Sequence, residues 1–270
     1  MNKFGLLGGN LSHSKSPILH EIIMKTANIL GEYILFEAKT DKEVNDVLVR
    51  VKGGEIKGLN VTIPHKERVI PFLDDISEAA KSIGAINVVV NVEGKLVGHN
   101  TDYEGFRATV CRMSIPLVNE NVFVLGAGGA AKAVVKALLD ECAHVILVTR
   151  DVEKAKKSFT DFESLNFITY NELLEEKGTL IVNCTPCGMI PNNKSSAVTA
   201  FIVDNFPYVI DIVYNPYTTL FMSYASKTAK VENGLYMLVV QAIRAQEIWN
   251  DVKIECVEEV YQVMKTEYLK

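Results

Sequence analysis

Residues 122–131 read Val122-Phe123-Val124-Leu125-Gly126-Ala127-Gly128-Gly129-Ala130-Ala131. An apolar, strand-like run leads into a glycine-rich turn, and a helical stretch and a second apolar run, Val145–Val148, follow. This order is typical of a βαβ unit that binds a dinucleotide, because the turn lets the backbone approach a pyrophosphate and the helix start offers unpaired N–H groups. A glycine-rich turn that binds no ligand is the alternative. The context favours a Rossmann-like dinucleotide-binding domain.

The residues that end the second apolar run indicate which dinucleotide is bound. Thr149-Arg150 stands where a carboxylate would accept hydrogen bonds from a ribose 2′-hydroxyl. A guanidinium instead favours a 2′-phosphate, through charge-assisted and bidentate hydrogen bonds. Asp151 adds a negative charge beside this position, and an ion pair of Arg150 with Asp151 or Glu153 is the alternative. The pattern therefore predicts NADP in preference to NAD.

Length and composition predict a globular protein of two domains. The chain has 270 residues, of which 48% are hydrophobic and 23% are charged. A net charge of −5 without a long basic run argues against a nucleic-acid partner. No apolar segment approaches the roughly 20 residues of a membrane span, and no signal-peptide pattern is expected at the N-terminus. Five scattered cysteines favour free thiols in a reducing compartment, so the expected location is the cytoplasm.

Alternating strands and helices up to about residue 101 predict a first α/β domain. Ser16-Pro17 is typical of an N-cap followed by the first helical residue, and Thr40 with Glu43 is a capping box. Gly53-Gly54 is expected to end the second helix, and Pro64 to stop a strand. The expected strands are Phe4–Leu7, Ile34–Ala38, Gly58–Ile63 and a hairpin of Ile86–Val92 with Leu96–Val97, and the first helix is expected to run to about Asn28.

The alternation of strands and helices restarts at Asn121. A helix is expected from Asp102, and a final helical region from Tyr236 would contribute Trp249 and Tyr261 to a core. No low-complexity linker separates the two halves, so we expect a cleft between two closely packed domains. A doubly wound sheet, with its ligand beyond the strand carboxyl ends, is predicted from strands at Val122–Leu125, Val145–Val148, Leu180–Asn183 and Val209–Ile212.

Two serines before the first helix are candidates for binding an anion. Ser14 and Ser16 place hydroxyl groups beside a helix N-terminus, which suits a small carboxylate. If Ser16 caps the helix, its oxygen accepts a backbone N–H while its own proton stays available to a ligand. A plain N-cap in a serine-rich turn is the alternative.

Polar residues also gather where two further strands end. Asn60 and Thr62 alternate along one strand and so point to one face, and the turn after that strand carries Lys66. Asn100-Thr101-Asp102 ends another strand. Lys66 could move a proton or act as a fixed charge, or simply be a solvent-exposed turn residue. Asp102 could serve a ligand or only cap the next helix.

A pair of cysteines three residues apart, Cys184 and Cys187, invites comparison with metal and redox motifs. Zinc would require further ligands at suitable spacing, and a thioredoxin-like motif would open a helix. Pro186 and Gly188 predict a loop here instead. We therefore expect no metal site and two cysteines incidental to a loop at the ligand crevice.

Taken together, these segments resemble the shikimate dehydrogenase family over essentially the whole chain. Eight of its motifs occur in order, which is a specific match although each motif alone is not. The matching segments are Ser14-Lys15-Ser16-Pro17, Asn60-Val61-Thr62-Ile63-Pro64-His65-Lys66, Gly84-Ala85-Ile86-Asn87, Gly98-His99-Asn100-Thr101-Asp102, Gly126 to Ala131, Asn183-Cys184-Thr185-Pro186-Cys187-Gly188-Met189, Asp211-Ile212-Val213-Tyr214-Asn215-Pro216 and Gly234 to Ala242.

The resemblance implies a reversible reduction of 3-dehydroshikimate to shikimate by NADPH, with Lys66 and Asp102 at the reacting oxygen. The implied substrate-binding residues are Ser14, Ser16 and Tyr214 at the carboxylate, and Asn60, Thr62, Asn87, Asp102 and Gln241 around the ring hydroxyls. The implied cofactor-binding residues are Gly126, Ala127, Gly128, Gly129, Ala130, Ala131, Thr149, Arg150, Thr185, Met189, Ile212 and Gly234.

The same resemblance implies a discontinuous substrate-binding domain, residues 1–101 with 236–270, and an inserted cofactor domain, residues 102–235. A monomer or a homodimer is expected. A quinate/shikimate dehydrogenase that uses NAD or NADP is the nearest alternative. A catalytically silent sensor is disfavoured by the retention of Lys66 and Asp102, and a folate-linked methylene dehydrogenase would not require Ser14 and Ser16.

Overall fold

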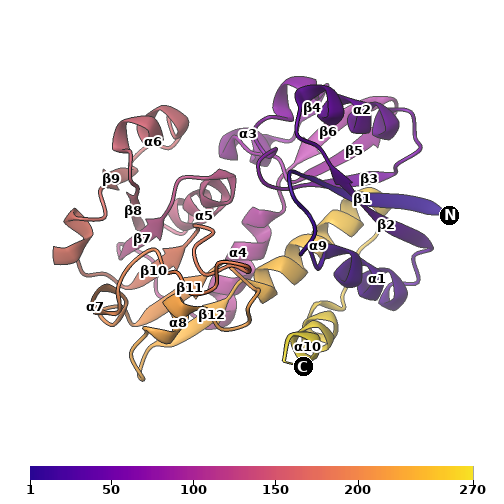
Figure 1. Ribbon diagram of the computed structural model, residues 1–270. Helices are drawn as coiled ribbons and strands as arrows, with labels where there is room; N and C mark the ends of the chain where they lie inside the picture. The colour runs from indigo at the N-terminus through magenta and orange to yellow at the C-terminus, as the bar shows by residue number, and fades with distance from the viewer. Residues whose placement is uncertain (270) are drawn as a thin grey trace. The chain divides into compact units, whose positions relative to one another are not determined.

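The computed structural model describes residues 1–269, which form two compact units (Figure 1). The first unit comprises Met1–Asp102 and Val239–Met264, and the second comprises Tyr103–Leu238 with the residues that follow Met264. Each unit has a six-stranded sheet. The α/β class and the two sheets predicted from the sequence are confirmed. None of the helices in residues 1–269 is both long and apolar enough to cross a bilayer.

The first unit is built on a mixed sheet of order β2-β1-β3-β5-β6-β4, in which β5 runs antiparallel to β3 and β6. Its strands are β1 (Asn2–Gly8), β2 (Gly31–Glu37), β3 (Gly58–Val61), β4 (Asp75–Ile76), β5 (Val88–Val92) and β6 (Lys95–His99). Its helices are α1 (Ser16–Thr26), α2 (Asp41–Lys52), the short 3-10 helix η1 (Ile70–Phe72), α3 (Glu78–Ile83) and most of α9 (Leu235–Asn250) and α10 (Val257–Tyr268).

Local sequence signals explain several of these boundaries. Thr40 and Glu43 form the predicted capping box at the start of α2, with the Glu43 N–H donating to Thr40 Oγ1 over 3.3 Å. The predicted hairpin turns at Glu93-Gly94, where both residues have positive φ. The prediction that Ser16 caps α1 is wrong, because α1 begins at Ser16 and its N-cap is Lys15. A proline is tolerated throughout the first helical turn, so Pro17 alone did not fix the cap.

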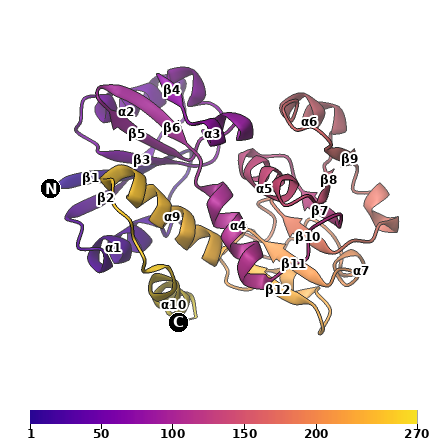
Figure 2. The ribbon, with the colours of Figure 1, turned by 180° about the vertical axis from the view of Figure 1, so that it is seen from behind.

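Apolar layers cover both faces of the first sheet. On one face, α2 packs Val44 and Leu48 against the strands. On the other, Trp249 of α9 stacks on Phe4 of β1 at 5.2 Å between ring centroids. The indole also covers Gly58, where a Cβ would lie 2.2 Å from the ring, so only glycine fits. The C-terminal helix α9 therefore lies beside the N-terminal strands (Figure 2), and Trp249 and Tyr261 are buried as predicted.

The second unit is built on a fully parallel sheet of order β12-β11-β10-β7-β8-β9. Its strands are β7 (Asn121–Leu125), β8 (His144–Val148), β9 (Asn166–Ile168), β10 (Leu180–Asn183), β11 (Tyr208–Asp211) and β12 (Lys230–Asn233). Its helices are α4 (Asp102–Met113), α5 (Gly129–Asp140), α6 (Val152–Ser158), the 3-10 helix η2 (Glu172–Glu175), α7 (Ala200–Val203) and α8 (Leu220–Ser223). The strand order reverses between β7 and β10, which is where doubly wound folds bind ligands.

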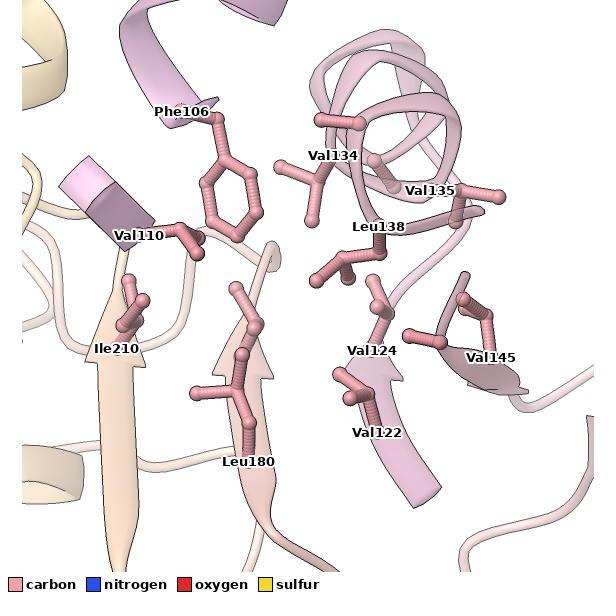
Figure 3. Close-up of a cluster of buried hydrophobic side chains, with 14 of the residues drawn as sticks. Phe106, Val110, Val122, Val124, Val134, Val135, Leu138, Val145, Leu180 and Ile210 are labelled. Carbon is pink, nitrogen blue, oxygen red and sulfur yellow. The ribbon is translucent and has the colours of Figure 1, made fainter. Parts of the chain in front are cut away.

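Helices bury both faces of this second sheet. Figure 3 shows Phe106 and Val110 of α4 and Val134 and Leu138 of α5 directed at the strands. The strand side chains that they meet include Val122, Val124, Val145, Leu180 and Ile210. The opposite face packs against α7 and α8. Burial on both sides explains the continuous apolar runs in the sequence and holds the glycine-rich turn rigidly at the end of β7.

Candidate functional site

The first unit brings Lys66 and Asp102 together as an ion pair between Nζ and Oδ2. Lys66 lies in the turn after β3, and its carbonyl oxygen accepts a 2.7 Å hydrogen bond from the Ile86 N–H. The two side chains are only 13% and 9% exposed. Their charges therefore interact in a poorly hydrated setting that solvent still reaches, which suits proton transfer to a bound ligand.

The Asp102 carboxylate does not cap α4, which was the alternative left open by the sequence. Its partners are Lys66 at Oδ2 and the Asn87 amide, whose Nδ2 donates to Oδ1 over 2.9 Å. Asn100 serves the helix start instead, because its Oδ1 accepts the Asp102 N–H at 3.1 Å. The Asn100 amide is itself held by the Ala85 carbonyl at 2.8 Å. This division leaves the Asp102 carboxylate directed at Lys66.

Asn87 is the hub of a buried amide cluster beside the ion pair. Besides Asp102, its Nδ2 approaches Thr101 Oγ1 at 3.1 Å and Gln241 Oε1 at 3.4 Å. Its Oδ1 accepts the Thr101 N–H at 2.7 Å. The Thr101 hydroxyl donates to the Gln241 carbonyl at 3.0 Å, which attaches α9 to the strand ends. Asn87, Asp102 and Gln241, which the family resemblance implies around the ring hydroxyls, thus meet at one place.

Four further predicted residues of the first unit lie around the ends of β1 and β3. Asn60 is buried, with Nδ2 donating to the Asn87 carbonyl at 3.2 Å. Thr62 and Ser16 are half-buried, and their hydroxyls make no hydrogen bond within residues 1–269. Ser14 Oγ accepts the Ser16 N–H at 3.3 Å, so Ser14 shapes the turn before α1 and the Ser16 hydroxyl keeps its donor and acceptor capacity.

The glycine-rich turn of the second unit fits a pyrophosphate. Gly128 is the N-cap of α5, and no side chain caps that helix start. A Cβ on Gly128 would meet nothing within 4 Å, so the space in front of the N–H groups is open. Gly126 has a φ of +96°, and a Cβ there would lie 2.8 Å from the Thr185 methyl. Unpaired N–H groups and a positive helix end facing open space suit an anion.

Arg150, after β8, is exposed and forms no ion pair or hydrogen bond within the part of the chain that is described. Asp151 does not pair with it, because Asp151 Oδ1 caps α6 by accepting the Lys154 N–H at 2.9 Å. The buried Thr149 precedes them. The Asp151 carboxylate, which could have opposed a phosphate at this position, is thus directed at the N-terminus of α6. The Arg150 guanidinium stays available to a phosphate.

A chain of hydrogen bonds shapes the loop that follows β10. Asn183 Oδ1 accepts both the Thr185 N–H, at 3.0 Å, and the Thr185 hydroxyl, at 2.7 Å. The Thr185 oxygen accepts the Cys187 N–H at 3.2 Å. On its other side the Asn183 amide donates to Asp211 Oδ1 at 2.9 Å. The loop conformation therefore rests on a buried carboxylate at the end of β11.

Asp211 is fully buried and has no cationic partner among residues 1–269. Its oxygens accept from the Thr219 hydroxyl at 2.5 Å and from the Val213 N–H at 3.0 Å, in addition to Asn183. Burial raises the pKa of Asp211 to about 6, although these hydrogen bonds oppose the shift. Thr219 also packs on Gly188, at 3.3 Å from where a Cβ would lie. One carboxylate thus supports both ends of the loop.

The remaining predicted residues of the second unit lie near these strand ends. Ile212 follows β11, and its carbonyl oxygen would be 2.0 Å from a Cβ on Gly234, so this approach requires glycine. Met189 is 43% exposed in the loop after β10. Tyr214 belongs to this unit rather than to the one that holds the serines, and burial raises the pKa of its hydroxyl.

The cysteines of the loop after β10 are free thiols. Cys184 is the more enclosed, and burial raises the pKa of its thiol. Within residues 1–269, no three histidine, cysteine or acidic side chains gather as a metal site would require. A thiol with a raised pKa is a poor nucleophile, so nothing in the geometry around Cys184 points to thiol chemistry.

Sequence reasoning missed Asp211 and Thr219 as individual contributors to the loop. Asp211 was noted only as part of a motif, and Thr219 was not noted. A signal was present, because Asn183 and Asp211 each end an apolar strand run. Polar residues that end neighbouring parallel strands meet at the same sheet edge. Their pairing in register, which the structure shows, could have been anticipated from that rule.

Comparison with family models and known sequences gives consistent matches. Residues 6–89 match the model described as the shikimate dehydrogenase substrate binding domain. The chain is 44% identical to a protein of Clostridium perfringens named shikimate dehydrogenase (NADP(+)), over 99% of this chain and 100% of that one. It is 38% identical to a protein of the same name from Pyrococcus furiosus, over 91% and 89% of the two chains.

Solved structures agree with the sequence matches. A chorismate mutase/shikimate 5-dehydrogenase fusion protein from Clostridium acetobutylicum superposes with a TM-score of 0.94 at 39% identity, covering 100% of this chain and 99% of that chain. A shikimate 5-dehydrogenase from Thermus thermophilus, solved in complex with NADP(H) and shikimate, gives 0.85 at 32% identity, with 97% and 99% covered. Both similarities extend over the two units described above.

Proposed function

This chain belongs to the shikimate dehydrogenase family, and from that premise we propose that it catalyses the reversible, NADPH-dependent reduction of 3-dehydroshikimate to shikimate. The reaction is a step in aromatic amino-acid biosynthesis, which we place in the cytoplasm. The first unit would bind the substrate. The substrate-binding domain that the sequence predicts, residues 1–101 with 236–270, corresponds to this unit apart from a few residues at its boundaries. The second unit, residues 102–235, would bind the cofactor. Relatives named NADP(+)-dependent support the choice of cofactor.

The observation that carries the proposal is the ion pair of Lys66 and Asp102, surrounded by amide side chains. Reducing a ketone places negative charge on its oxygen, which must then take up a proton. Bound NADPH supplies the hydride. The Lys66 ammonium can stabilise the developing charge and give a proton from Nζ, and the resulting amine can take it back in the reverse direction. Asp102, held by Asn87, keeps Nζ in place.

The polar side chains of the first unit match the functional groups of the proposed substrate. The hydroxyls of Ser14 and Ser16 beside the start of α1 suit its carboxylate, and we assign Tyr214 to the same group. The remaining assigned residues would bind the ring hydroxyls, and they are Asn60, Thr62, Asn87, Asp102 and Gln241. Amide and hydroxyl groups can both donate and accept, which suits a polyhydroxylated ring.

The second unit offers a matching set of groups for the cofactor. We propose that the turn Gly126–Ala131 binds the pyrophosphate, and that Thr149 and Arg150 bind the 2′-phosphate. The nicotinamide half would lie against the loop after β10 and the end of β11, at Thr185, Met189, Ile212 and Gly234. Open space at Gly128 and an unpaired guanidinium at Arg150 support these assignments.

A spectrophotometric assay of the purified chain tests the proposal. Formation of reduced dinucleotide is followed with shikimate or quinate as substrate and with NADP or NAD as cofactor, in all four combinations. We expect the highest kcat/KM for shikimate with NADP. Equal kcat/KM for quinate would favour the alternative of a quinate/shikimate dehydrogenase. Absence of turnover in all four combinations would contradict the proposal.

A further inference from the structure

A continuous chain of hydrogen bonds runs through the first unit from a surface lysine to Asn60. Lys57 Nζ donates to Asn250 Oδ1 at 2.9 Å, and Asn250 Nδ2 donates to Gln246 Oε1 at 2.9 Å. Gln246 Nε2 lies 3.0 Å from His20 Nδ1, and His20 is hydrogen-bonded to the Asn60 side chain. Asn60 then donates to the Asn87 carbonyl at 3.2 Å. These hydrogen bonds join five side chains, which belong to α1, α9, β3 and the residue before β3.

The direction of every bond in this chain follows from two groups at its outer end, the Lys57 ammonium and the Gln246 backbone carbonyl, which accepts from Asn250 Nδ2 at 2.9 Å. An ammonium group only donates, so Asn250 must turn its oxygen toward Lys57 and its amide nitrogen toward Gln246. Gln246 must then accept at Oε1 and donate from Nε2. His20 Nδ1 is consequently an acceptor, and the ring proton lies on Nε2. That proton faces Asn60, whose oxygen accepts it and whose amide nitrogen is left to donate.

The surroundings of His20 are consistent with this neutral tautomer. The ring is buried, and burial lowers the pKa of His20 to about 3. It is therefore uncharged at neutral pH and can accept from Gln246, itself fully buried. The imidazole stacks on Tyr33 at 4.0 Å and 10° and also lies near Trp249, at 5.6 Å between centroids. These rings leave the imidazole little freedom to rotate.

Tyr33 adds a second donor to the same Asn60 oxygen. Its hydroxyl donates to Asn60 Oδ1 at 2.7 Å. An amide rotated by 180° would place its NH2 against the His20 N–H and its oxygen against the Asn87 carbonyl, so it would lose two hydrogen bonds, while the Tyr33 hydroxyl could turn and accept. The amide orientation of Asn60 is thus determined from two sides, by His20 and by the Asn87 carbonyl, and the Tyr33 hydroxyl adds a hydrogen bond in that orientation.

We propose that His20, Tyr33, Gln246 and Asn250, oriented from Lys57, are positioning residues that allow Asn60 to offer only an N–H donor to a ligand. The ligand atom beside Asn60 must then be a hydrogen-bond acceptor, such as a hydroxyl oxygen whose proton points elsewhere. This inference rests on the proposed function, in which Asn60 faces the ring hydroxyls of the substrate. It adds a group of residues that would affect substrate affinity without touching the substrate.

Two substitutions test the two ends of the chain of hydrogen bonds. Tyr33→Phe removes one donor from Asn60 and keeps the stacked ring. We expect KM for shikimate to rise about fivefold, the value of one neutral hydrogen bond, with kcat and KM for NADP nearly unchanged. Lys57→Glu replaces a hydrogen-bond donor by an acceptor on a half-exposed residue. A carboxylate at this position would favour an Asn250 amide that turns its nitrogen, rather than its oxygen, toward residue 57. We expect KM for shikimate to rise roughly tenfold and the His20 ring proton to move toward Nδ1.

The His20 tautomer, read from its 15N chemical shifts, separates positioning from a general structural role. Lys57→Arg keeps a donor and should restore the Nε2–H tautomer and the KM of the unmodified chain. Lys42→Glu, an equal charge change on the exposed face of α2, is the control and should change neither quantity. Unchanged tautomer and KM in Lys57→Glu, or unchanged KM in Tyr33→Phe, would overturn the proposal. Absence of shikimate turnover in the unmodified chain would instead contradict the proposed function. The His20 tautomer could still be measured in that case, so the two failures can be told apart.

Discussion

Each unit contains an asparagine that donates its amide to an aspartate, and the two pairs have the same length and different surroundings. Asn87 donates to Asp102, and Asn183 donates to Asp211, each over 2.9 Å. Asp102 also faces the ammonium of Lys66. Asp211 instead accepts only from neutral groups, the Thr219 hydroxyl and a backbone N–H. The difference lies in how the negative charge is compensated.

Charge compensation explains why one pair suits chemistry and the other suits positioning. A carboxylate paired with an ammonium can hold a proton donor ready in a partly buried site. A fully buried carboxylate without a cation has a raised pKa, and its value lies in fixing the direction of its hydrogen bonds. The cations of the two units also differ in charge compensation. Lys66 forms an ion pair with Asp102, whereas Arg150 forms none within residues 1–269.

Removing the cation from the first pair should have the largest effect. Lys66→Met deletes the proposed proton donor and leaves Asp102 without its counter-charge. We expect kcat to fall on the order of 10²- to 10⁴-fold, the usual contribution of a positioned acid or base, while KM for shikimate changes little. Steady-state assays at saturating NADP measure both quantities. Lys81→Met, in an exposed ion pair with Glu78, is the matched control, and a kcat within tenfold of the unmodified chain would remove Lys66 from this role.

The uncompensated pair should be visible in the pH dependence of stability. The pKa of Asp211 rises on folding from an ordinary value near 3.8 to about 6, so its stabilising contribution is complete below pH 3.8 and is lost as pH rises through 6. The shift corresponds to about 3 kcal/mol. Relative to Asp211→Asn, the unmodified chain should therefore lose about that much unfolding free energy between pH 4 and 7 in urea titrations. Asp204→Asn, at an exposed aspartate, is the control, and parallel curves for Asp211→Asn would contradict the expected shift.

How far the sequence predicted this arrangement depends on the range of the interaction. The capping box of Thr40 and Glu43 and the turn at Glu93-Gly94 are local, and both were predicted correctly. The short strands β9 and β12 were missed, because three or four residues with exposed or half-exposed positions carry little apolar pattern. The bond between Asn183 and Asp211 spans 28 residues, so only the rule that polar residues ending neighbouring parallel strands meet at one sheet edge could have anticipated it.

The candidate site shows the same division. Lys66 and Asp102 were candidates from the residues themselves and Asn87 from the family resemblance, yet their contacts depend on how β3, β5 and α4 pack. Ser16 was wrongly expected to cap α1, because the cap can shift by one residue when a proline occupies the first turn. From the sequence, Asp151 was considered only as a charge beside Arg150 or its ion-pair partner, whereas the structure shows that it caps α6 by accepting the Lys154 N–H.

Adding a second carboxylate to the uncompensated pair should disturb the loop after β10. In Asn183→Asp, a carboxylate would replace the amide that donates to Asp211 and to the Cys187 carbonyl. Repulsion between the two acids should release Thr185 and weaken NADPH binding roughly thirtyfold, measured by fluorescence titration. Affinity for adenosine 2′,5′-bisphosphate, which lacks the nicotinamide half, should stay within about twofold. Asn205→Asp, on an exposed turn, is the control, and an equal loss for both ligands would indicate general disruption of the unit.

The smallest expected effect concerns the unpaired cation of the second unit. Arg150→Leu removes no hydrogen bond or ion pair within residues 1–269, so stability should change little. It removes charge-assisted hydrogen bonds to a 2′-phosphate, which predicts roughly tenfold weaker binding of NADP and unchanged binding of NAD. Titration of both cofactors, with Lys157→Leu on the exposed face of α6 as control, measures the difference. Equal losses for NADP and NAD would mean that Arg150 does not read the phosphate, and the contrast between a paired cation for chemistry and an unpaired one for recognition would fail.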